Sequence, residues 1–176
     1  NRLLNKLPVK VASYESIFDS LPSKENLELI EFQYSDENTV TISPIVKNET
    51  LTLKPKVYLG IGCNRDTPFE EIESCIKEFL TKHNLTMEQV KNIASFEAKS
   101  DEKGLLEFAS KYNFDINFYE KEAINSLEHK FSKSASTKFF GTVGVAEPSA
   151  VLASKYKELI IKKEVYNKSI TIAGAI

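Results

Sequence analysis

Apolar and polar positions follow two different patterns along the chain, and the change falls near residue 55. Before it, short apolar runs separated by prolines predict one helix and three strands, at 15–21 and at 9–12, 27–33 and 39–46. After it, longer apolar runs alternate with stretches of helical period. The pattern predicts a small α/β segment at 1–54 and a C-terminal α/β domain at 55–176.

The second region is predicted as strand and helix in turn. Apolar side chains from Phe69 to Leu80 recur at helical spacing and predict a helix over 69–83, with Thr67 as its N-cap and Pro68 in its first turn. The other expected elements are strands at 56–61, 94–98, 115–119, 158–163 and 169–175 and helices at 86–93, 102–112, 120–129 and 147–155. This alternation predicts a three-layer α/β/α sandwich with a mixed, mainly parallel sheet.

Composition and charge narrow the class of protein. Of the 176 residues 41% are hydrophobic and 27% charged, as in ordinary globular domains, and the net charge of −2 argues against a strongly basic nucleic-acid binder. No apolar run approaches the roughly 20 residues that span a bilayer. Two cysteines do not make a disulfide framework. We expect a cytoplasmic protein that binds neither nucleic acid nor membrane.

The most informative segment is Tyr58-Leu-Gly-Ile-Gly-Cys-Asn-Arg-Asp-Thr-Pro68, in which a strand leads through a glycine turn into a capped helix. Backbone N–H groups and the positive end of a helix dipole favour an anion at such a corner. The candidate substrate-binding residues of this turn are Gly60, Gly62, Cys63, Asn64 and Thr67. Arg65 stands where a dinucleotide fingerprint has its third glycine, and no P-loop spacing follows. A tight turn without a ligand is the alternative.

Arg65 is one of two arginines in a lysine-rich chain, and it directly follows this turn. A planar guanidinium suits a carboxylate or a phosphate, so Arg65 is a candidate for binding one. The alternative is a surface pair with Glu70 or Glu71. Lys99, at the end of another predicted strand, adds positive charge to the same edge of the sheet.

Cys63 lies at the tip of the turn, where a helix N-terminus can lower the pKa of a thiol. A nucleophilic cysteine needs a base, and the two histidines, His83 and His129, both fall in or near the ends of predicted helices. Covalent catalysis by Cys63 is therefore not the favoured interpretation. Cys75 follows the apolar face of its helix and is predicted to be core.

A second glycine segment, at 139–152, contains Gly141, Gly144 and Glu147. The two glycines permit close approach of the backbone, and Glu147 opens a predicted helix. Its carboxylate can complement the helix dipole, or it can act as a base that orients a water molecule. If the loops that contain Arg65, Lys99 and Glu147 all follow strands of one sheet, they meet at one edge, where open α/β sheets bind ligands.

These loops, in this order, resemble the C-terminal domain of the cobalamin-biosynthesis CbiG family. The matching segments are Gly60-Ile-Gly-Cys63 with Arg65 and Thr67, Asp101-Glu-Lys-Gly-Leu105, Gly141-Thr-Val-Gly-Val-Ala-Glu-Pro148 and the closing strand. The resemblance runs from about Lys56 to the end, and 1–54 resembles part of the family's middle region. The chain departs from the family at Asn64 and Asp66, where a second basic residue and a glycine are usual.

The resemblance implies cobalt-precorrin-5A hydrolase activity, which opens the ring-A lactone and releases acetaldehyde to give cobalt-precorrin-5B. The substrate is a polyanionic tetrapyrrole that carries the cobalt, so no cofactor or metal site of the protein's own is expected. Arg65 and Lys99 are the implied carboxylate clamps, and Glu147 is the implied base. Backbone N–H groups at 62–64 are the candidates for stabilising the oxyanion of lactone hydrolysis.

Two other functions stay open at this point. The first is a non-catalytic tetrapyrrole-binding or scaffolding module of the same pathway, which gains weight because the large N-terminal domain of the family is not in this sequence. The second is a nucleotide-binding α/β domain, supported only by Gly60-Ile-Gly62 after a strand. That N-terminal domain, neighbouring pathway enzymes and a second copy of the chain are the partners compatible with this interpretation.

Overall fold

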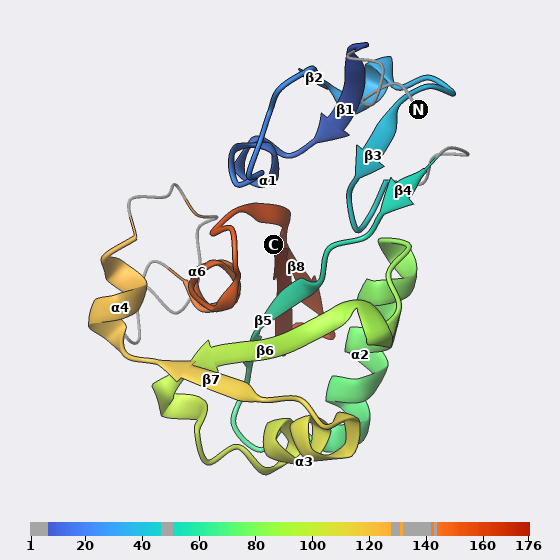
Figure 1. Cartoon of the computed structure of the whole chain (residues 1–176). Coiled ribbons are helices and arrows are strands. Elements are labelled where there is room, and N and C mark those ends of the chain that lie inside the picture. The colour runs from blue at the N-terminus through green and yellow to red at the C-terminus, as the bar shows by residue number, and fades with distance from the viewer. Residues whose placement is uncertain (1–6, 47–50, 128–130, 132–141, 143) are drawn as a thin grey trace. The chain divides into compact units, whose positions relative to one another are not determined.

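The computed structural model describes residues 7–46, 51–127, 131, 142 and 144–176 (Figure 1). The chain divides into two compact units, Asn1–Pro55 and Lys56–Ile176. Each unit has a sheet of its own. The predicted site residues all belong to the second unit. In the described part of the chain, no helix is long and apolar enough to cross a membrane.

Unit 1 is a small four-stranded sheet with a short helix, α1 (Glu15–Asp19). Its strands are β1 (Val9–Ser13), β2 (Leu27–Ile30), β3 (Val40–Ile42) and β4 (Thr52–Leu53), in the order β2-β1-β3-β4. All of its strand pairs are parallel. Phe18 of α1 packs with Val9 and Val11 of β1 to form its apolar core.

Unit 2 contains a five-stranded mixed sheet in the order β7-β6-β5-β9-β8. Its strands are β5 (Val57–Cys63), β6 (Val90–Phe96), β7 (Ile116–Tyr119), β8 (Leu159–Tyr166) and β9 (Ile170–Ala175). β5, β6 and β7 pair in parallel, whereas β9 is antiparallel to both of its neighbours, β5 and β8. Four of the five strands therefore run the same way, and the mixed sheet is as expected.

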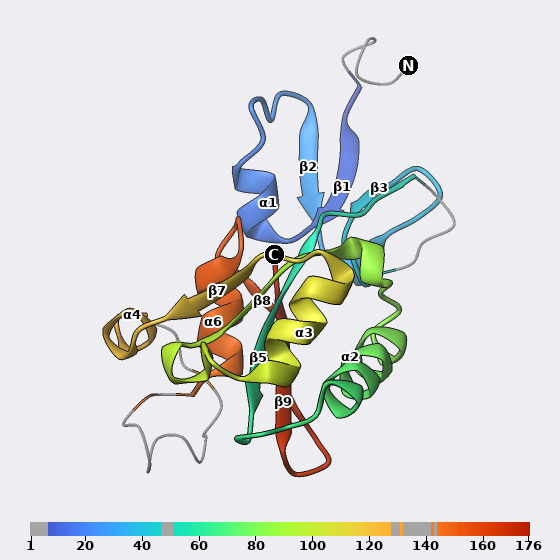
Figure 2. The same ribbon diagram turned by 90° about the horizontal axis from the view of Figure 1, so that it is seen from below.

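Helices cover both faces of this sheet (Figure 2). α2 (Phe69–Lys82) and α3 (Lys103–Tyr112) lie together on one side, and α6 (Ala146–Ala153) lies on the other with the short α4 (Lys121–Asn125). The apolar positions that predicted α2 are buried, from Ile72 to Leu80. The three-layer α/β architecture is confirmed.

Close backbone approach joins α6 to the centre of the sheet. A Cβ atom on Gly60 of β5 would lie 1.8 Å from the carbonyl oxygen of Ala146 and 2.6 Å from the amide nitrogen of Ala150. Only a residue without a side chain fits between this strand and this helix. Ala146, Ala150 and Val151 of α6 are buried against Ala173 and Ala175 of β9.

Some predicted boundaries are wrong, and each error has a local cause. The predicted helix at 86–93 is a single 3-10 turn, η2 (Met87–Gln89), because a capping box between Thr86 and Gln89 closes it and Val90 begins β6. The strand predicted at 27–33 ends at Ile30, and Phe32–Tyr34 forms another such turn, η1. The two-residue β4 was not predicted, since it is too short for an alternating pattern to show.

Candidate functional site

The loop that joins β5 to α2 contains the predicted anion corner, and most of its polar groups are already hydrogen bonded. The N–H of Asn64 donates to the carbonyl oxygen of Ser169 at 3.0 Å, so this N–H is already engaged, and its role in stabilising an oxyanion stays a prediction. Thr67 is not the N-cap of α2. Pro68 takes that position, and the buried Thr67 hydroxyl donates back to the Asn64 carbonyl oxygen at 2.9 Å.

Asp66 has a left-handed backbone with φ of 56°. Left-handed positions favour glycine, which is the residue that the resemblance implies at this position. The N–H of Asp66 donates to Oε2 of Glu102 at 3.0 Å. The loop after β5 is thus held by a carboxylate from the start of α3.

Glu102 is the centre of a buried charge cluster. Its side chain is only 3% exposed, and its Oε1 lies 3.1 Å from Nη1 of Arg65 and 3.2 Å from Nζ of Lys99. Lys99, in the 3-10 turn η3 (Glu97–Lys99), is itself only 11% exposed. The carboxylate therefore brings together the two cations that the sequence singled out.

Arg65 makes two further contacts with the segment before α3. Nη1 bonds to the Asp101 carboxylate, and Nη2 donates to the carbonyl oxygen of Ala98 at 2.7 Å. The bond from Arg65 lowers the pKa of the Asp101 carboxyl, and the same bond raises the pKa of the guanidinium. The alternative pairing of Arg65 with Glu70 or Glu71 is wrong, and the Glu71 carboxylate accepts a hydrogen bond from Ser169 instead.

A cleft of about 580 Å³ opens beside this cluster, between the beginnings of α2 and α3. Its walls contain both charge signs and are formed by Arg65, Asp66, Thr67, Pro68, Phe69, Glu70, Asp101, Glu102, Lys103, Gly104 and Glu107. Its volume is in the range of small-molecule sites. Arg65 is the guanidinium in this wall, so the cleft offers a planar group for a carboxylate or phosphate.

Cys63 is not poised as a nucleophile. The residue is buried at the end of β5, and burial raises the pKa of its thiol to about 11, so the thiol stays protonated at neutral pH. This agrees with the interpretation that the sequence favoured. Cys75 is buried in α2, as predicted, and His83 caps the C-terminal end of α2, where its ring lies 3.1 Å from the Glu164 carboxylate. His129 lies outside the described residues.

Two of the predicted glycines, Gly60 and Gly62, have packing roles, and Gly144 has a special backbone conformation. Gly60 admits α6, and a Cβ on Gly62 would lie 2.6 Å from Oγ1 of Thr171 and 3.5 Å from Cβ of Val145. Gly144 is buried and has a φ of 151°, a conformation that side chains rarely adopt. Gly141 lies outside the described residues.

Glu147 lies in the first turn of α6 and is 2% exposed. Its Oε1 accepts a hydrogen bond of 2.9 Å from the backbone N–H of Lys163 in β8. The carboxylate thereby ties α6 to an edge strand, whereas Arg65 and Thr67 line the cleft between α2 and α3. Lys99 does not line the cleft but contacts Glu102, which does. Its role as a base stays a prediction.

Sequence reasoning treated Asp101 and Glu102 as ordinary acids at a helix start and so missed their link to Arg65. Each lies more than 30 positions from Arg65 along the chain, and the parallel pairing of β5 with β6 brings the two loops together. One signal was available. Lys99 and Glu102 stand three residues apart, a spacing typical of a local ion pair.

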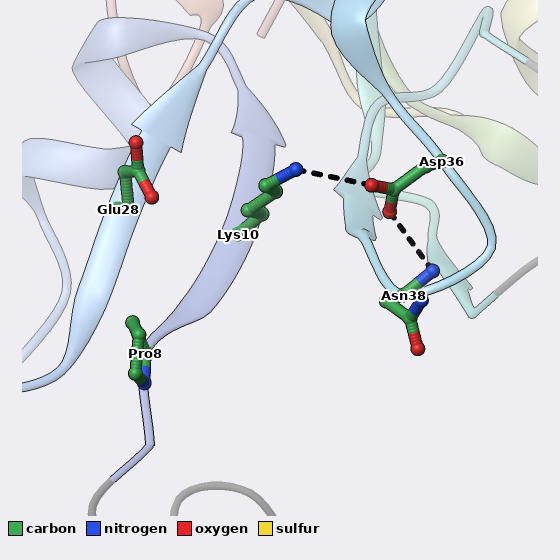
Figure 3. A pocket seen from close by; sticks show the side chains of 5 residues that line it. All are labelled: Pro8, Lys10, Glu28, Asp36 and Asn38. Carbon is green, nitrogen blue, oxygen red and sulfur yellow. Dashed lines mark hydrogen bonds and ion pairs between the residues drawn. The ribbon is translucent and has the colours of Figure 1, made fainter.

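A second hollow, of about 270 Å³, lies on unit 1 and is lined by Pro8, Lys10, Glu28, Asp36 and Asn38 (Figure 3). Lys10 donates to Asp36 at 3.0 Å, and Asp36 also accepts bonds from the Thr39 hydroxyl and the Asn38 N–H. The bonds from Thr39 and Lys10 lower the pKa of Asp36 to about 2. This network closes the turn before β3, which makes the hollow a weaker candidate than the cleft of unit 2.

Comparison with known proteins places the chain in a family. The model of the family described as "Cobalamin synthesis G C-terminus" matches residues 57–175. The chain belongs to this family. The resemblance inferred from the glycine segments is therefore confirmed. A cobalt-precorrin-5A hydrolase of Priestia megaterium is 33% identical to this chain over an alignment 175 residues long, which covers 95% of this chain and 44% of that protein. This member of the family thus spans less than half the length of that relative.

Solved structures agree with this family fold. The crystal structure of CobE, a protein from the cobalamin (vitamin B12) biosynthetic pathway, matches with a TM-score of 0.61 at 22% identity, over 68% of this chain and 91% of that chain. A putative cobalamin biosynthesis protein G homolog from Sulfolobus solfataricus matches with a TM-score of 0.56 at 23% identity, over 98% of this chain and 51% of that chain. At these identities the likeness concerns the fold alone.

Proposed function

We propose that the chain is the C-terminal portion of a cobalt-precorrin-5A hydrolase of cobalamin biosynthesis. The observation that carries this proposal is the 33% identity to the Priestia megaterium hydrolase over nearly the whole chain. The family match over 57–175 supports it. The reaction adds water to the ring-A lactone of cobalt-precorrin-5A and yields cobalt-precorrin-5B and acetaldehyde, with the cobalt carried by the substrate throughout.

The cleft supplies the recognition chemistry that such a substrate needs. Acetate and propionate groups surround a precorrin macrocycle, and the Arg65 guanidinium in the cleft wall suits a carboxylate. Lys99 adds a second positive charge beside it through Glu102. In this proposal, Arg65 and Lys99 hold the rim of the macrocycle, and the lactone lies toward the ends of β5 and β6.

Glu147 is proposed as the base that orients the attacking water. Val145, just before α6, lies against Gly62 near the end of β5, so the first turn of α6 is close to the edge of the sheet where the lactone is placed. The bond from the Lys163 N–H fixes the orientation of the carboxylate. A base held in this way needs no reorganisation before it takes a proton from water.

A non-catalytic tetrapyrrole-binding module is the second candidate. The structural match to CobE supports this candidate. The part of this chain that matches CobE covers 91% of the CobE chain. The fold can therefore constitute nearly a whole protein of the pathway. Binding of the substrate without turnover would select this candidate.

The deciding experiment is anaerobic incubation of the chain with cobalt-precorrin-5A, with acetaldehyde measured through an alcohol dehydrogenase couple. We expect release above a control without protein, and we expect Glu147→Gln to slow it about a hundredfold or more, the usual size of a general-base contribution. Glutamine keeps an oxygen that can accept the Lys163 N–H, so the variant removes the charge and retains this hydrogen bond. Unchanged release would remove Glu147 from the mechanism, and no release from folded protein that binds the substrate would favour the module.

A further inference from the structure

Arg65 is bound by two adjacent carboxylates that differ sharply in burial. The Glu102 side chain is 3% exposed and the Asp101 side chain is 73% exposed. The Arg65 side chain between them is 55% exposed. One guanidinium thus faces a buried acid on one side and a solvated acid on the other.

Glu102 is held as a permanent anchor. It accepts from the Asp66 N–H, from Arg65 and from Lys99, so three donors from two loops share one buried carboxylate. Removing the carboxylate would leave the largely buried Lys99 ammonium without this partner, and breaking a buried pair is strongly destabilising. Its charge therefore cannot be exchanged for that of a ligand.

Asp101 has no comparable hold. Its side chain bonds to Arg65 and to its own backbone N–H, and it otherwise faces solvent in the cleft wall. Exposed ion pairs of this kind contribute little to stability, so another carboxylate can replace Asp101 at small cost. The donation from Arg65 Nη2 to the Ala98 carbonyl holds the guanidinium in place while this happens.

We propose that Asp101 is a place-holding carboxylate, which a carboxylate of a polycarboxylate ligand displaces from Arg65, while Glu102 is the positioning residue that keeps Arg65 in the cleft wall. This proposal rests on the proposed function for the identity of the ligand, a tetrapyrrole with carboxylates on its rim. Arg65 is then an exchange site, in which its ion pair with Asp101 is replaced by an ion pair with a carboxylate of the ligand. The proposal also gives the two acids opposite effects on binding.

The test is a fluorescence titration of the full chain with uroporphyrin, a tetrapyrrole octacarboxylate, at constant ionic strength. Asp101→Asn removes the internal competitor, and we expect binding about two- to fivefold tighter, the range that exposed pairs allow. Glu102→Gln removes the anchor, and we expect binding at least about fivefold weaker, although it too deletes one negative charge beside Arg65. If only net charge mattered, both variants would bind the polyanionic uroporphyrin more tightly, because each removes one negative charge.

Glu107→Gln is the matched control. Glu107 lines the same cleft from α3, is exposed, and its side chain has no hydrogen bond or ion pair within the described residues. It changes the net charge of the cleft by the same amount as Asp101→Asn without touching Arg65, so it measures the gain in affinity that comes from net charge alone, and we expect that gain to be clearly smaller than the gain of Asp101→Asn. An equal gain in both variants would reduce the effect to general charge and overturn the proposal.

The remaining outcomes are also decisive. Weaker or unchanged binding by Asp101→Asn, or no binding of uroporphyrin by the unchanged chain, overturns the exchange. If Glu102→Gln does not fold, as judged by circular dichroism, the comparison of Asp101→Asn with Glu107→Gln carries the test alone. Acetaldehyde release is measured separately. If the binding pattern is as expected but no acetaldehyde is released, the proposed hydrolase activity is overturned and the exchange at Arg65 is supported. If acetaldehyde is released but the binding pattern is not as expected, the exchange alone is overturned.

Discussion

Gly104 shows how a single missing side chain shapes the cleft. A Cβ atom there would lie 2.3 Å from the carbonyl oxygen of Thr67 and 2.9 Å from the amide nitrogen of Phe69. These are backbone atoms at the start of α2, and they cannot turn aside as a flexible side chain can. The start of α3 can therefore approach the start of α2 this closely only because position 104 is glycine. The shape of the cleft between the two helix starts depends on this approach.

We expect Gly104→Ala to destabilise the protein by about 1–3 kcal/mol, the usual cost of overpacking, even though alanine favours a helix by about 0.5–1 kcal/mol over glycine. Urea unfolding at neutral pH measures the difference. Gly174→Ala is the control, because its Cβ would meet the Ile161 side chain at 3.1 Å and that side chain can shift. A cost at position 104 no larger than at position 174 would contradict this explanation.

At the residue scale, the sequence identified the cations of the site but not the acids that hold them. Arg65 and Thr67 stand out because they follow a glycine turn, and both line the cleft. Asp101 carries no local mark that separates it from a dipole-complementing acid, and the spacing of Glu102 from Lys99 indicates only a local ion pair. Their role depends on a contact between two loops, which no spacing along the chain reveals.

Glu73 joins α2 to α3 at the scale of secondary-structure elements. Its Oε1 accepts hydrogen bonds of 2.6 Å from both Lys111 Nζ and Tyr112 Oη of α3, and its Oε2 lies 3.1 Å from Nζ of Lys77 on its own helix. The bonds from Lys111 and Tyr112 lower the pKa of this carboxyl from 4.5 to about 2. The two helices that form the cleft are therefore linked by an ionised acid.

Because the folded-state pKa of Glu73 lies below its ordinary value, its contribution to stability is complete above about pH 4.5 and is lost as the pH falls toward about 2. We expect Glu73→Gln to make the urea midpoint fall less steeply than in the unchanged protein across that window. Glu88→Gln is the control, since the Glu88 side chain has no hydrogen bond or ion pair in the part of the chain that the structure describes. Parallel pH curves for Glu73→Gln and the unchanged protein would count against this link.

Long periodic elements were predictable, and short or ambiguous ones were not. Five apolar positions at helical spacing identified α2. Residues 86–93 were misread because Val90 and Ile93 fit a helix as well as a buried strand. The pairing of β6 between β5 and β7 decides between the two, and that pairing is a tertiary event.

At the scale of the whole molecule, unit 2 holds everything that the cleft requires. Its sheet, the helices on both faces and the network around Glu102 all lie within Lys56–Ile176. Its large buried side chains, among them Leu59, Phe79 and Phe108, belong to the same unit. The CobE chain, most of which matches this fold, shows the architecture nearly on its own.

We therefore expect a protein containing only residues 56–176 to fold by itself and to unfold in one cooperative urea transition. It is also expected to bind uroporphyrin as the full chain does. Circular dichroism with denaturant and the same fluorescence titration measure these properties. A broad, non-cooperative transition would show that unit 1 is needed for the stability of unit 2.

The position of β9 between β5 and β8 makes the order of synthesis matter for this fold. A ribosome delivers β5, β6 and β7 long before residues 170–175, so one edge of β5 stays open while more than a hundred further residues emerge. Open strand edges invite pairing with other chains. The β8–β9 hairpin is the piece that closes this edge, and a polypeptide interrupted before residue 170 would keep β5 exposed to its neighbours.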